Sequence, residues 1–542
     1  MIGKIVVSGI SLILVVGVVI GVVAAVNRSG DSSQNTDALS PQMKAVTQLC
    51  QPTNYKETCT KVLGSANSTD PKALIKAGVL AISDSLTKSM NLSEDLVGNA
   101  GSSEPRTKLA LDDCNILLKN ASDELQDILA KMSDNDLKNI AERADDFRIW
   151  LSSIISYQEL CIDGFDHDGD LKSKVQNSTN YGSELTDNVL TILGGISDIL
   201  QNFGLQLNLP NINSRRLLGA DGYPTWLSAA DRKLLAVGNA GKAAPNAVVA
   251  LDGSGQFKSI NAAINSRPKG QNGRFVIYVK AGIYNEAVVV PKKLIFSLVE
   301  APGFICKGMG FQNTAGPDGH QAVAIRVNSD LSVFHNCRFD GYQDTLLYQA
   351  GRQFYRNCVI SGTIDFLFGY GAAVIQNSLI IVRKPNPNQF NTVTADGKKE
   401  KGQTTGLVIH NCRIVPEAKL VPERLTVKTY LGRPWKQFST TVVMESQLGD
   451  LIQPDGWMPW AGSQFLDTLF YAEYANTGPG ANTARRVKWK TLHFLNKNEA
   501  QRFTVGTFLA AGSMDRRRWS SFLAWISGID EQSQLSKKTK EN

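Results

Sequence analysis

The second half of the chain consists of short apolar runs that end in small or polar residues. Runs such as RFVIYVKAG, RQFYRNCVISG and GLVIHNCRIV begin near Val248 and recur at about the spacing of coils in a stacked solenoid. This pattern predicts an all-β domain that folds as a right-handed parallel β-helix. The dipeptide Asn-Cys recurs at equivalent-looking run ends, as stacked ladders require, at Asn336-Cys337, Asn357-Cys358 and Asn411-Cys412.

Two aspartates stand out within these runs. Asp344 in GYQDTLLY and Asp365 in GTIDFLFG lie 21 positions apart, the separation that also relates Cys337 to Cys358. A single aspartate in a solenoid coil is more often a turn or ladder residue. An unpaired carboxylate in such apolar surroundings is costly, so it shifts its pKa or finds a partner. One coil of separation would place the two carboxyl groups together, which predicts an acid/base pair and a hydrolytic reaction.

The first half has a different period. Segments such as LALDDCNILLKNASDELQDIL place apolar residues at i, i+3, i+4 and i+7, so residues 40–205 are expected to form an all-α four-helix bundle. Two cysteine pairs suit this bundle. Cys50 and Cys59 could close a short hairpin, and Cys114 and Cys161 lie on segments that a disulfide could clamp together.

The charge of the chain is divided between these halves. Residues 1–218 hold 19 Lys and Arg against 26 Asp and Glu, and residues 219–542 hold 38 against 24. An acidic half therefore precedes a basic half. A basic domain attracts polyanions such as nucleic acid, anionic membrane or acidic polysaccharide, and charge alone does not separate these partners.

The N-terminus predicts export. The segment Ile5–Val26 is apolar and uncharged, is long enough to span a bilayer, and follows Lys4. Residues 1–28 are therefore expected to be a signal anchor or a cleaved signal peptide, with a cleavage site available near Val23-Ala24-Ala25.

Glycosylation and cysteine usage agree with an exported protein. Eight cysteines in such a protein favour disulfides, and neither a CxxC spacing nor a cluster of the five histidines suggests a metal site. We therefore expect no metal or other cofactor. The N-glycosylation sequons all precede residue 219, at Asn27, Asn67, Asn91, Asn120 and Asn177.

Two resemblances follow from longer motifs. The cysteine hairpin LCQPTNYKETC, LDDC and YQELCIDGF resemble the domain of invertase and pectin methylesterase inhibitors. From about residue 244 to 512, the ordered motifs GIYNEAV, FQNTAGPDGHQAVAIRV, GYQDTLLYQAGRQFYRNC, GTIDFLFG, YLGRPW and FYAEYANTGPGA resemble plant pectin methylesterases (pectinesterases). An unrelated disulfide-clamped bundle is the alternative for the first half.

The second resemblance implies a reaction and two catalytic roles. The substrate would be methyl-esterified homogalacturonan, and the products methanol and acidic pectin, without a cofactor. Asp365 matches the family nucleophile, which attacks the methyl ester while ionised. Asp344 matches the general acid and base, which starts the reaction protonated. Two adjacent carboxyl groups cannot both ionise cheaply, so their proximity separates their pKa values.

The same resemblance assigns the remaining site residues. Gln343 and Gln321 match positions that donate to the oxyanion, and Gln321 also matches a substrate contact. Arg433 in GRPW matches the arginine that keeps Asp365 charged, and Trp435 matches a tryptophan that contacts the sugar. Alone, the glutamines would be interpreted as hydrogen-bonded core amides and the arginine as a structural ion pair. A disulfide between Cys337 and Cys358 in adjacent coils is also expected.

A linker at residues 206–243 separates the two domains. It is rich in Gly, Ala and Asn, lacks apolar periodicity, and contains two basic pairs that are each followed by Leu-Leu. These pairs resemble the sites at which such precursors lose their inhibitory half to a processing protease, and a solvated basic patch is the alternative. The pairs are Arg215-Arg216 and Arg232-Lys233.

The chain departs from the pectinesterase pattern in two places. KLIFSLVEAPGF is shorter than the usual passage there, so a segment near residues 294–301 is expected to be missing, together with more than one coil. Residues 513–542 form an atypical tail to which we assign no function.

Three functions remain open at this stage. The first is a pectinesterase precursor whose inhibitor-like bundle is an intramolecular partner of the enzyme. It would travel through the secretory pathway to the cell wall, and it would touch membrane only through the N-terminal segment and bind no nucleic acid. The second is a β-helical polysaccharide lyase or polygalacturonase, and lyases usually need Ca²⁺. The third is a catalytically impaired relative that acts only through the inhibitor-like domain.

Overall fold

The fold is described from a computed structural model of the chain. Residues 45–542 form one compact unit, and all contacts discussed below lie within it. The structure describes residues 39–99, 105–133, 137–165, 169–203, 222–224, 226–228, 231–232, 235, 245–268, 275–290, 298–299 and 302–509. The predicted N-terminal segment, most of the linker and the C-terminal tail lie outside these residues.

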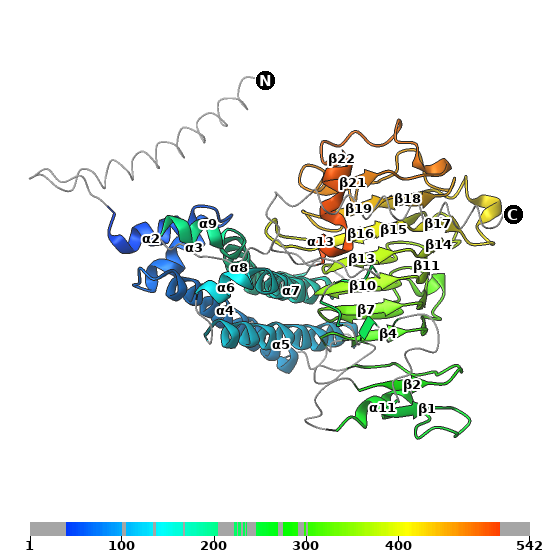
Figure 1. Ribbon diagram of the computed structural model, residues 1–542, viewed down its shortest axis with the longest axis horizontal. Helices are drawn as coiled ribbons and strands as arrows, with labels where there is room; N and C mark the ends of the chain where they lie inside the picture. Colours follow the sequence, from blue (N-terminus) through cyan, green and yellow to red (C-terminus); the bar gives the residue numbers. More distant parts are fainter. Residues whose placement is uncertain are drawn as a thin grey trace, which may run out of the picture. The chain divides into compact units, whose positions relative to one another are not determined.

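The first half is a helical bundle built on four long helices, as predicted. Helix α4 packs against α5 and α8, and α7 also packs against α5 and α8 (Figure 1). Leu111, Leu118 and Leu125 of α5 repeat every seven residues and are fully buried, which is how an amphipathic helix buries one face. The helices are α2 (Pro41–Cys50), α3 (Lys56–Ser65), α4 (Pro71–Asn99), α5 (Pro105–Ser133), α6 (Leu137–Glu142), α7 (Ala144–Asp163), α8 (Asp170–Gly194) and α9 (Ile196–Asn202).

Two disulfides fix the bundle, and both were predicted. Cys50–Cys59 joins α2 to α3 across nine residues, and Cys114–Cys161 joins α5 to α7 across 47 residues. A cross-link that closes a longer loop removes more entropy from the unfolded chain, so the second disulfide is expected to stabilise the bundle more.

The second half is a parallel β-helix, as predicted. Three sheets are built from every third strand as far as β20. Strands β21 and β22 then extend the sheet that contains β19, and every strand pair in the three sheets is parallel. Figure 1 shows β4, β7, β10, β13 and β16 stacked in chain order. One sheet has the order β22-β21-β19-β16-β13-β10-β7-β4, the second β20-β17-β14-β11-β8-β5, and the third β18-β15-β12-β9-β6-β3.

These strands are short and nearly uniform in length. Those from β3 to β12 are β3 (Leu298–Val299), β4 (Ile305–Lys307), β5 (Gly310–Gln312), β6 (Ile325–Asn328), β7 (Ser332–His335), β8 (Arg338–Asp340), β9 (Leu346–Ala350), β10 (Arg352–Arg356), β11 (Val359–Gly362) and β12 (Leu367–Gly369). Those from β13 to β22 are β13 (Ala372–Gln376), β14 (Leu379–Val382), β15 (Asn391–Asp396), β16 (Gly406–His410), β17 (Arg413–Pro416), β18 (Thr429–Gly432), β19 (Thr440–Met444), β20 (Gln447–Leu448), β21 (Phe470–Tyr474) and β22 (Leu492–Phe494).

Asparagines turn the chain between the sheets. Asn336, Asn357 and Asn411 have φ values of 53°, 57° and 51°, in the left-handed region. Asparagine tolerates this conformation better than most residues because its short amide can hydrogen-bond locally. The repeated Asn-Cys pairs of the sequence therefore mark one recurring corner of the β-helix.

The predicted disulfide between Cys337 and Cys358 is wrong in this structure, in which both residues are free thiols. The Cys337 and Cys358 side chains of adjacent coils interact as thiols, without a bond between their sulfur atoms. The Cys358 thiol also donates to the Phe334 carbonyl oxygen at 3.5 Å. The Cys337 sulfur lies 3.7 Å from that of Cys306, whereas a disulfide requires about 2.0 Å.

A small separate sheet precedes the three large ones. It pairs β1 (Ala247–Val249) with β2 (Ile277–Val279), and α11 (Ile260–Asn265) packs on it. Two further short helices, α12 (Lys497–Ala500) and α13 (Val505–Phe508), follow β22. Within the part of the chain that the structure describes, no helix combines the length and apolar character needed to cross a membrane.

Candidate active site

The β-helix places the two aspartates on neighbouring coils. Strands β9 and β12 pair in register, with Leu346 opposite Leu367, and each aspartate stands two residues before its strand begins. The backbone N–H of Asp344 donates to the carbonyl oxygen of Ile364 at 3.0 Å. Both aspartates have positive φ, 61° for Asp344 and 50° for Asp365, a conformation that is uncommon outside glycine and clusters at functional sites. The structure therefore brings the two aspartates to neighbouring coils, as their spacing predicted.

Asp365 is held as a carboxylate by two partners. Arg433 donates from Nε at 2.9 Å and from Nη2 at 2.6 Å, one bond to each carboxylate oxygen. The Thr392 hydroxyl donates at 2.6 Å, and the Asp365 side chain is buried. A bidentate guanidinium bond is strong only when the acceptor is ionised. The surroundings of Asp365 therefore suit a nucleophile.

Asp344 has the opposite environment. Burial raises the pKa of this carboxyl group well above its usual range, and the charge of Asp365 raises it further, whereas Arg433 lowers it. A raised pKa favours the protonated form of Asp344. The two carboxyl groups therefore differ in their surroundings, because Arg433 and Thr392 bond to Asp365 and burial acts on Asp344.

Arg433 is itself fixed by aromatic rings. It follows β18 directly, and its guanidinium lies 4.2 Å from the ring centre of Trp460 and 5.5 Å from that of Phe390. These cation–π contacts hold the planar fork in place for Asp365. Thr392 on β15 and these two rings were not among the predicted residues, because no spacing in the sequence relates them to the aspartates.

The two glutamines lie beside the carboxyl pair. Gln321 and Gln343 form an isolated parallel bridge, in which the N–H of Ala322 donates to the carbonyl oxygen of Gln343 at 3.2 Å. Gln343 immediately precedes Asp344. Gln321 is exposed and Gln343 is half-buried.

Trp435 belongs to an apolar surface next to the carboxyl pair. Its ring centre lies 4.7 Å from that of Tyr370 and 5.8 Å from that of Phe368. A side chain at Gly397 would come within 2.9 Å of the indole, so glycine is required there. The tryptophan packs against a small cluster formed by Leu347, Phe368 and Ala395 with Val323, Trp460 and Leu160.

Helix α7 of the bundle contacts this same surface. Its Leu160 is a member of the apolar cluster. On either side, Glu159 binds the ammonium of Lys399 at 2.5 Å, and Asp163 binds that of Lys436 at 2.7 Å. Asp163 also accepts a hydrogen bond from the Tyr370 hydroxyl. No spacing in the sequence gives a signal for Lys399 or Lys436, which pair with a helix more than 200 residues away.

The remaining predicted sites are placed as follows. Asn67, Asn91 and Asn177 are exposed and Asn120 is half-buried, so the sequons stay predicted glycosylation sites. Arg232 is in the described part of the linker, whereas Arg215, Arg216 and Lys233 are outside it. Among the described residues, no group of three or more His, Cys, Asp or Glu could hold a metal ion.

Comparisons with known proteins identify the family. Residues 246–299 and 296–513 match the model described as Pectinesterase, and residues 44–192 match that of the plant invertase/pectin methylesterase inhibitor. Pectinesterase 4 of Arabidopsis thaliana is 44% identical over 579 residues, which cover 94% of this chain and 97% of the relative. A probable pectinesterase/pectinesterase inhibitor of Brassica napus is 41% identical, with the same coverage of 94% and 97%. The solved pectin methylesterase from carrot is 41% identical, with a TM-score of 0.48, and covers 54% of this chain and 97% of its own.

The family model and the relatives define the chain as a carboxylic ester hydrolase. It belongs to the plant pectinesterase/pectinesterase inhibitor family, with an N-terminal inhibitor domain and a C-terminal pectinesterase domain.

The alignments also bear on the shortened passage near residues 294–301. The family model matches in two pieces that meet at residues 296–299, and the alignment of 579 positions is longer than the 542 residues of this chain. Positions of the relatives are therefore missing from this chain. Both observations support the expected deletion, which stays a prediction.

Proposed function

We propose that this pectinesterase hydrolyses methyl esters of homogalacturonan to methanol and acidic pectin, through an acyl-enzyme on Asp365. The proposal rests on the asymmetry of the carboxyl pair. Asp365 receives two bonds from Arg433, whereas burial and the charge of Asp365 raise the pKa of Asp344. A nucleophile must be ionised and a general acid protonated, and the two environments meet these requirements.

In the first step, a carboxylate oxygen of Asp365 attacks the C6 carbonyl carbon of a methylated galacturonate. The tetrahedral oxyanion accepts hydrogen bonds from the amides of Gln321 and Gln343, each of which contributes about 3 kcal/mol where the geometry is good. The C–O bond to the methoxy group breaks, and Asp344 gives its proton to the departing methanol. The products of this step are methanol and a mixed anhydride on Asp365.

In the second step, Asp344 is a carboxylate and removes a proton from water. The resulting hydroxide attacks the same carbonyl carbon, and the bond to Asp365 breaks. The sugar is released as a carboxylic acid, which gives its proton to bulk water. The Asp365 carboxylate is restored beside Arg433, and Asp344 is again protonated by the proton it took from the attacking water. No cofactor takes part in this sequence.

The apolar surface and the basic charge would hold the polysaccharide. Trp435 offers a flat face on which a pyranose ring can pack, next to the ring of Phe368. Beyond this surface, the excess of Lys and Arg after residue 219 favours the anionic product, which would keep the enzyme on one chain.

The inhibitor domain would restrain the enzyme before processing. In this proposal, α7 occupies the surface that the sugar needs, because Leu160 packs in the apolar cluster and Glu159 and Asp163 bind Lys399 and Lys436. A protease that cuts the linker at Arg215-Arg216 or Arg232-Lys233 would release the bundle. The N-terminal signal would carry the precursor through the secretory pathway to the cell wall, either cleaved or retained as a membrane anchor.

Methanol release tests the proposed reaction. The full chain is secreted from an oxidising host, cut in the linker, and incubated with highly esterified pectin, while methanol and polymer length are followed together. We expect methanol without shortening of the polymer. Shortening with unsaturated ends would instead identify a lyase, and shortening without them a polygalacturonase.

A second function is favoured by the two-piece family match. A missing coil disturbs the stacking on which a solenoid depends, so the enzyme half could be inactive. The inhibitor-like bundle would then be the active part. In that case the released bundle would inhibit another pectinesterase, while the cut chain would release no methanol.

A further inference from the structure

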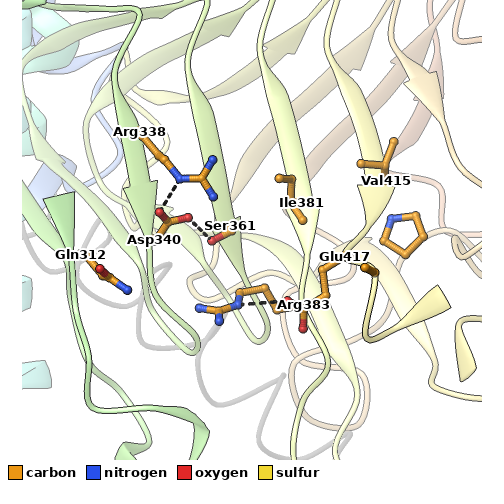
Figure 2. A pocket seen from close by; sticks show the side chains of 10 residues that line it. Gln312, Arg338, Asp340, Ser361, Ile381, Arg383, Val415 and Glu417 are labelled. Atoms are coloured by element: carbon orange, nitrogen blue, oxygen red, sulfur yellow. Dashed lines mark hydrogen bonds and ion pairs between the residues drawn. The ribbon is translucent and has the colours of Figure 1, made fainter. Parts of the chain in front are cut away.

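A groove crosses the sheet that contains β8, β11, β14 and β17, whereas the catalytic aspartates precede strands of another sheet. It has a volume of about 400 Å³. Figure 2 shows Arg338 and Arg383 on its wall, with Arg338 bonded to Asp340 and Arg383 directed at Glu417. The two arginines differ in what else they touch.

Arg383 reaches the loop that leads into the active site. Its Nη1 donates to the carbonyl oxygen of Gly341 at 2.8 Å, and its Nη2 donates to the Tyr342 hydroxyl at 2.8 Å. The guanidinium also lies 3.7 Å from the centre of the Tyr342 ring. One side chain therefore holds both residues that immediately precede Gln343 and Asp344.

This loop has to be held because its conformation is unusual. Asp344 has a φ of 61°, which persists only where the surroundings determine it. Two hydrogen bonds to the Ser361 carbonyl oxygen join the loop to the next coil. The backbone N–H of Gly341 donates at 3.2 Å, and the Thr345 hydroxyl donates at 2.9 Å. Arg383 adds the contact from the coil beyond.

Arg383 is itself rigidly placed. Its backbone N–H donates to the Gly362 carbonyl oxygen at 2.8 Å, directly after β14. Its Nε lies 3.5 Å from a carboxylate oxygen of Glu417, and that residue also accepts a bond from the N–H of Lys384 at 2.6 Å. The guanidinium is mostly buried, with one fifth of the side chain exposed. Because the guanidinium is already fixed in place, little conformational entropy is lost when it bonds to Gly341 and Tyr342.

We propose that Arg383 is a positioning residue for the esterase reaction. It acts through Gly341 and Tyr342 to fix the amide of Gln343 and the carboxyl group of Asp344. This proposal rests on the proposed function, since those two groups are assigned to the oxyanion and to proton transfer. Arg383 itself contacts neither carboxyl group in the described structure.

The test replaces Arg383 by lysine and uses Arg338→Lys as the matched control. Lysine keeps the positive charge but lacks the planar fork, so it cannot bind Gly341 and Tyr342 together and stack on the ring. Arg338 lies on the wall of the same groove and bonds to Asp340, outside the loop. Tyr342→Phe is a third variant, which keeps the stacked ring and removes only the hydroxyl.

We expect Arg383→Lys to lower kcat about tenfold with less change in KM, because a catalytic group is misplaced while the sugar surface is intact. The alkaline limb of the kcat profile should move to lower pH, because a loosened Asp344 becomes more exposed to water. Tyr342→Phe should fall between wild type and Arg383→Lys. Arg338→Lys should match wild type in all three measurements.

Amide hydrogen exchange gives a readout that needs no catalysis. Peptides that cover residues 341–345 should exchange about tenfold faster in Arg383→Lys than in Arg338→Lys, while the rest of the β-helix is unchanged. Wild-type exchange, or wild-type kcat with an unmoved pH profile, would overturn the proposal. If wild type releases no methanol, the proposed function fails, and the exchange rates alone still decide whether Arg383 holds the loop.

Discussion

The two carboxyl groups of the site differ in their partners. Asp365 accepts hydrogen bonds from Arg433 and Thr392, whereas Asp344 is buried next to the negative charge of Asp365. The same residue type is thus prepared for two roles by its surroundings. Two predictions follow at the scale of single residues.

Replacing Arg433 by lysine should lower kcat about a hundredfold, because lysine cannot bond to both oxygens of Asp365 or stack on Trp460. The steady-state rate of methanol release measures this. Arg424→Lys is the control, since Arg424 also binds both oxygens of a carboxylate, that of Asp450, at the surface. An equal loss of kcat in the two variants would contradict a specific catalytic role for Arg433.

In the proposed mechanism, proton transfer from Asp344 sets the alkaline limb of the activity. The group donates only while protonated, so activity is present below its raised pKa and is lost as pH rises through it. The folding stability contributed by Asp344 depends on pH in the same direction as the activity. Because the pKa is higher in the folded state, protonation of Asp344 favours folding at low pH, and this contribution is lost as the pH rises from about 4. A kcat profile that is flat above neutral pH would contradict the assignment.

At the scale of elements, α7 and the coils of the β-helix share one surface. Leu160 packs in the apolar cluster of Trp435, and two acidic residues of the helix bind lysines on either side. Asp163 follows Leu160 by three positions and Glu159 by four, the spacings that place helical residues on one face. The contact is therefore a property of one helical face.

Removing both charges of that face should activate the uncut precursor. In the double variant Glu159→Gln and Asp163→Asn, Lys399 and Lys436 lose their partners, so we expect about a tenfold gain in methanol release before linker cleavage. After cleavage the variant and wild type should agree. Asp170→Asn is the control, because Asp170 pairs with Lys174 within α8. An unchanged precursor would mean that α7 does not restrain the enzyme.

At the scale of the whole molecule, buried acids connect the two domains. Burial raises the pKa of Glu400 to about 7, and the charge of Asp187 raises it further, while Lys399 lowers it. The Tyr55 hydroxyl donates to Glu400 at 3.0 Å. A carboxyl group with a raised pKa stabilises the assembled state while protonated, so this contribution is lost as pH rises from about 4.5 through about 7.

We therefore expect the cut halves to stay together near pH 5 and to separate more readily near pH 8. Size-exclusion chromatography of the linker-cut protein at the two values measures this. Glu400→Gln should reduce the difference, because an amide does not titrate. Glu423→Gln, at an exposed pair with Lys384, should leave it unchanged. Tighter association at the higher pH would contradict the linkage.

Much of this architecture was predictable from the sequence, for physical reasons. A period of 3.6 predicts the bundle, and short apolar runs with regular corners predict the stacked β-helix. The separation of Asp344 and Asp365 by one coil predicts that they lie on neighbouring coils. Thr392, Lys399 and Lys436 were missed because their partners are set by tertiary packing. The disulfide of Cys337 and Cys358 was predicted wrongly, since a spacing of one coil brings two thiols to neighbouring coils but does not determine whether they form a covalent bond.

The central claim is that Asp365 is the nucleophile of an active esterase. The most direct test compares methanol release by the linker-cut wild type, Asp365→Asn and the control Asp450→Asn at equal folded concentration. We predict that Asp365→Asn loses all measurable release while still binding pectin, and that Asp450→Asn retains the wild-type rate. Retention of about a tenth of the wild-type rate in Asp365→Asn would contradict the claim, because removing a nucleophile costs far more than that.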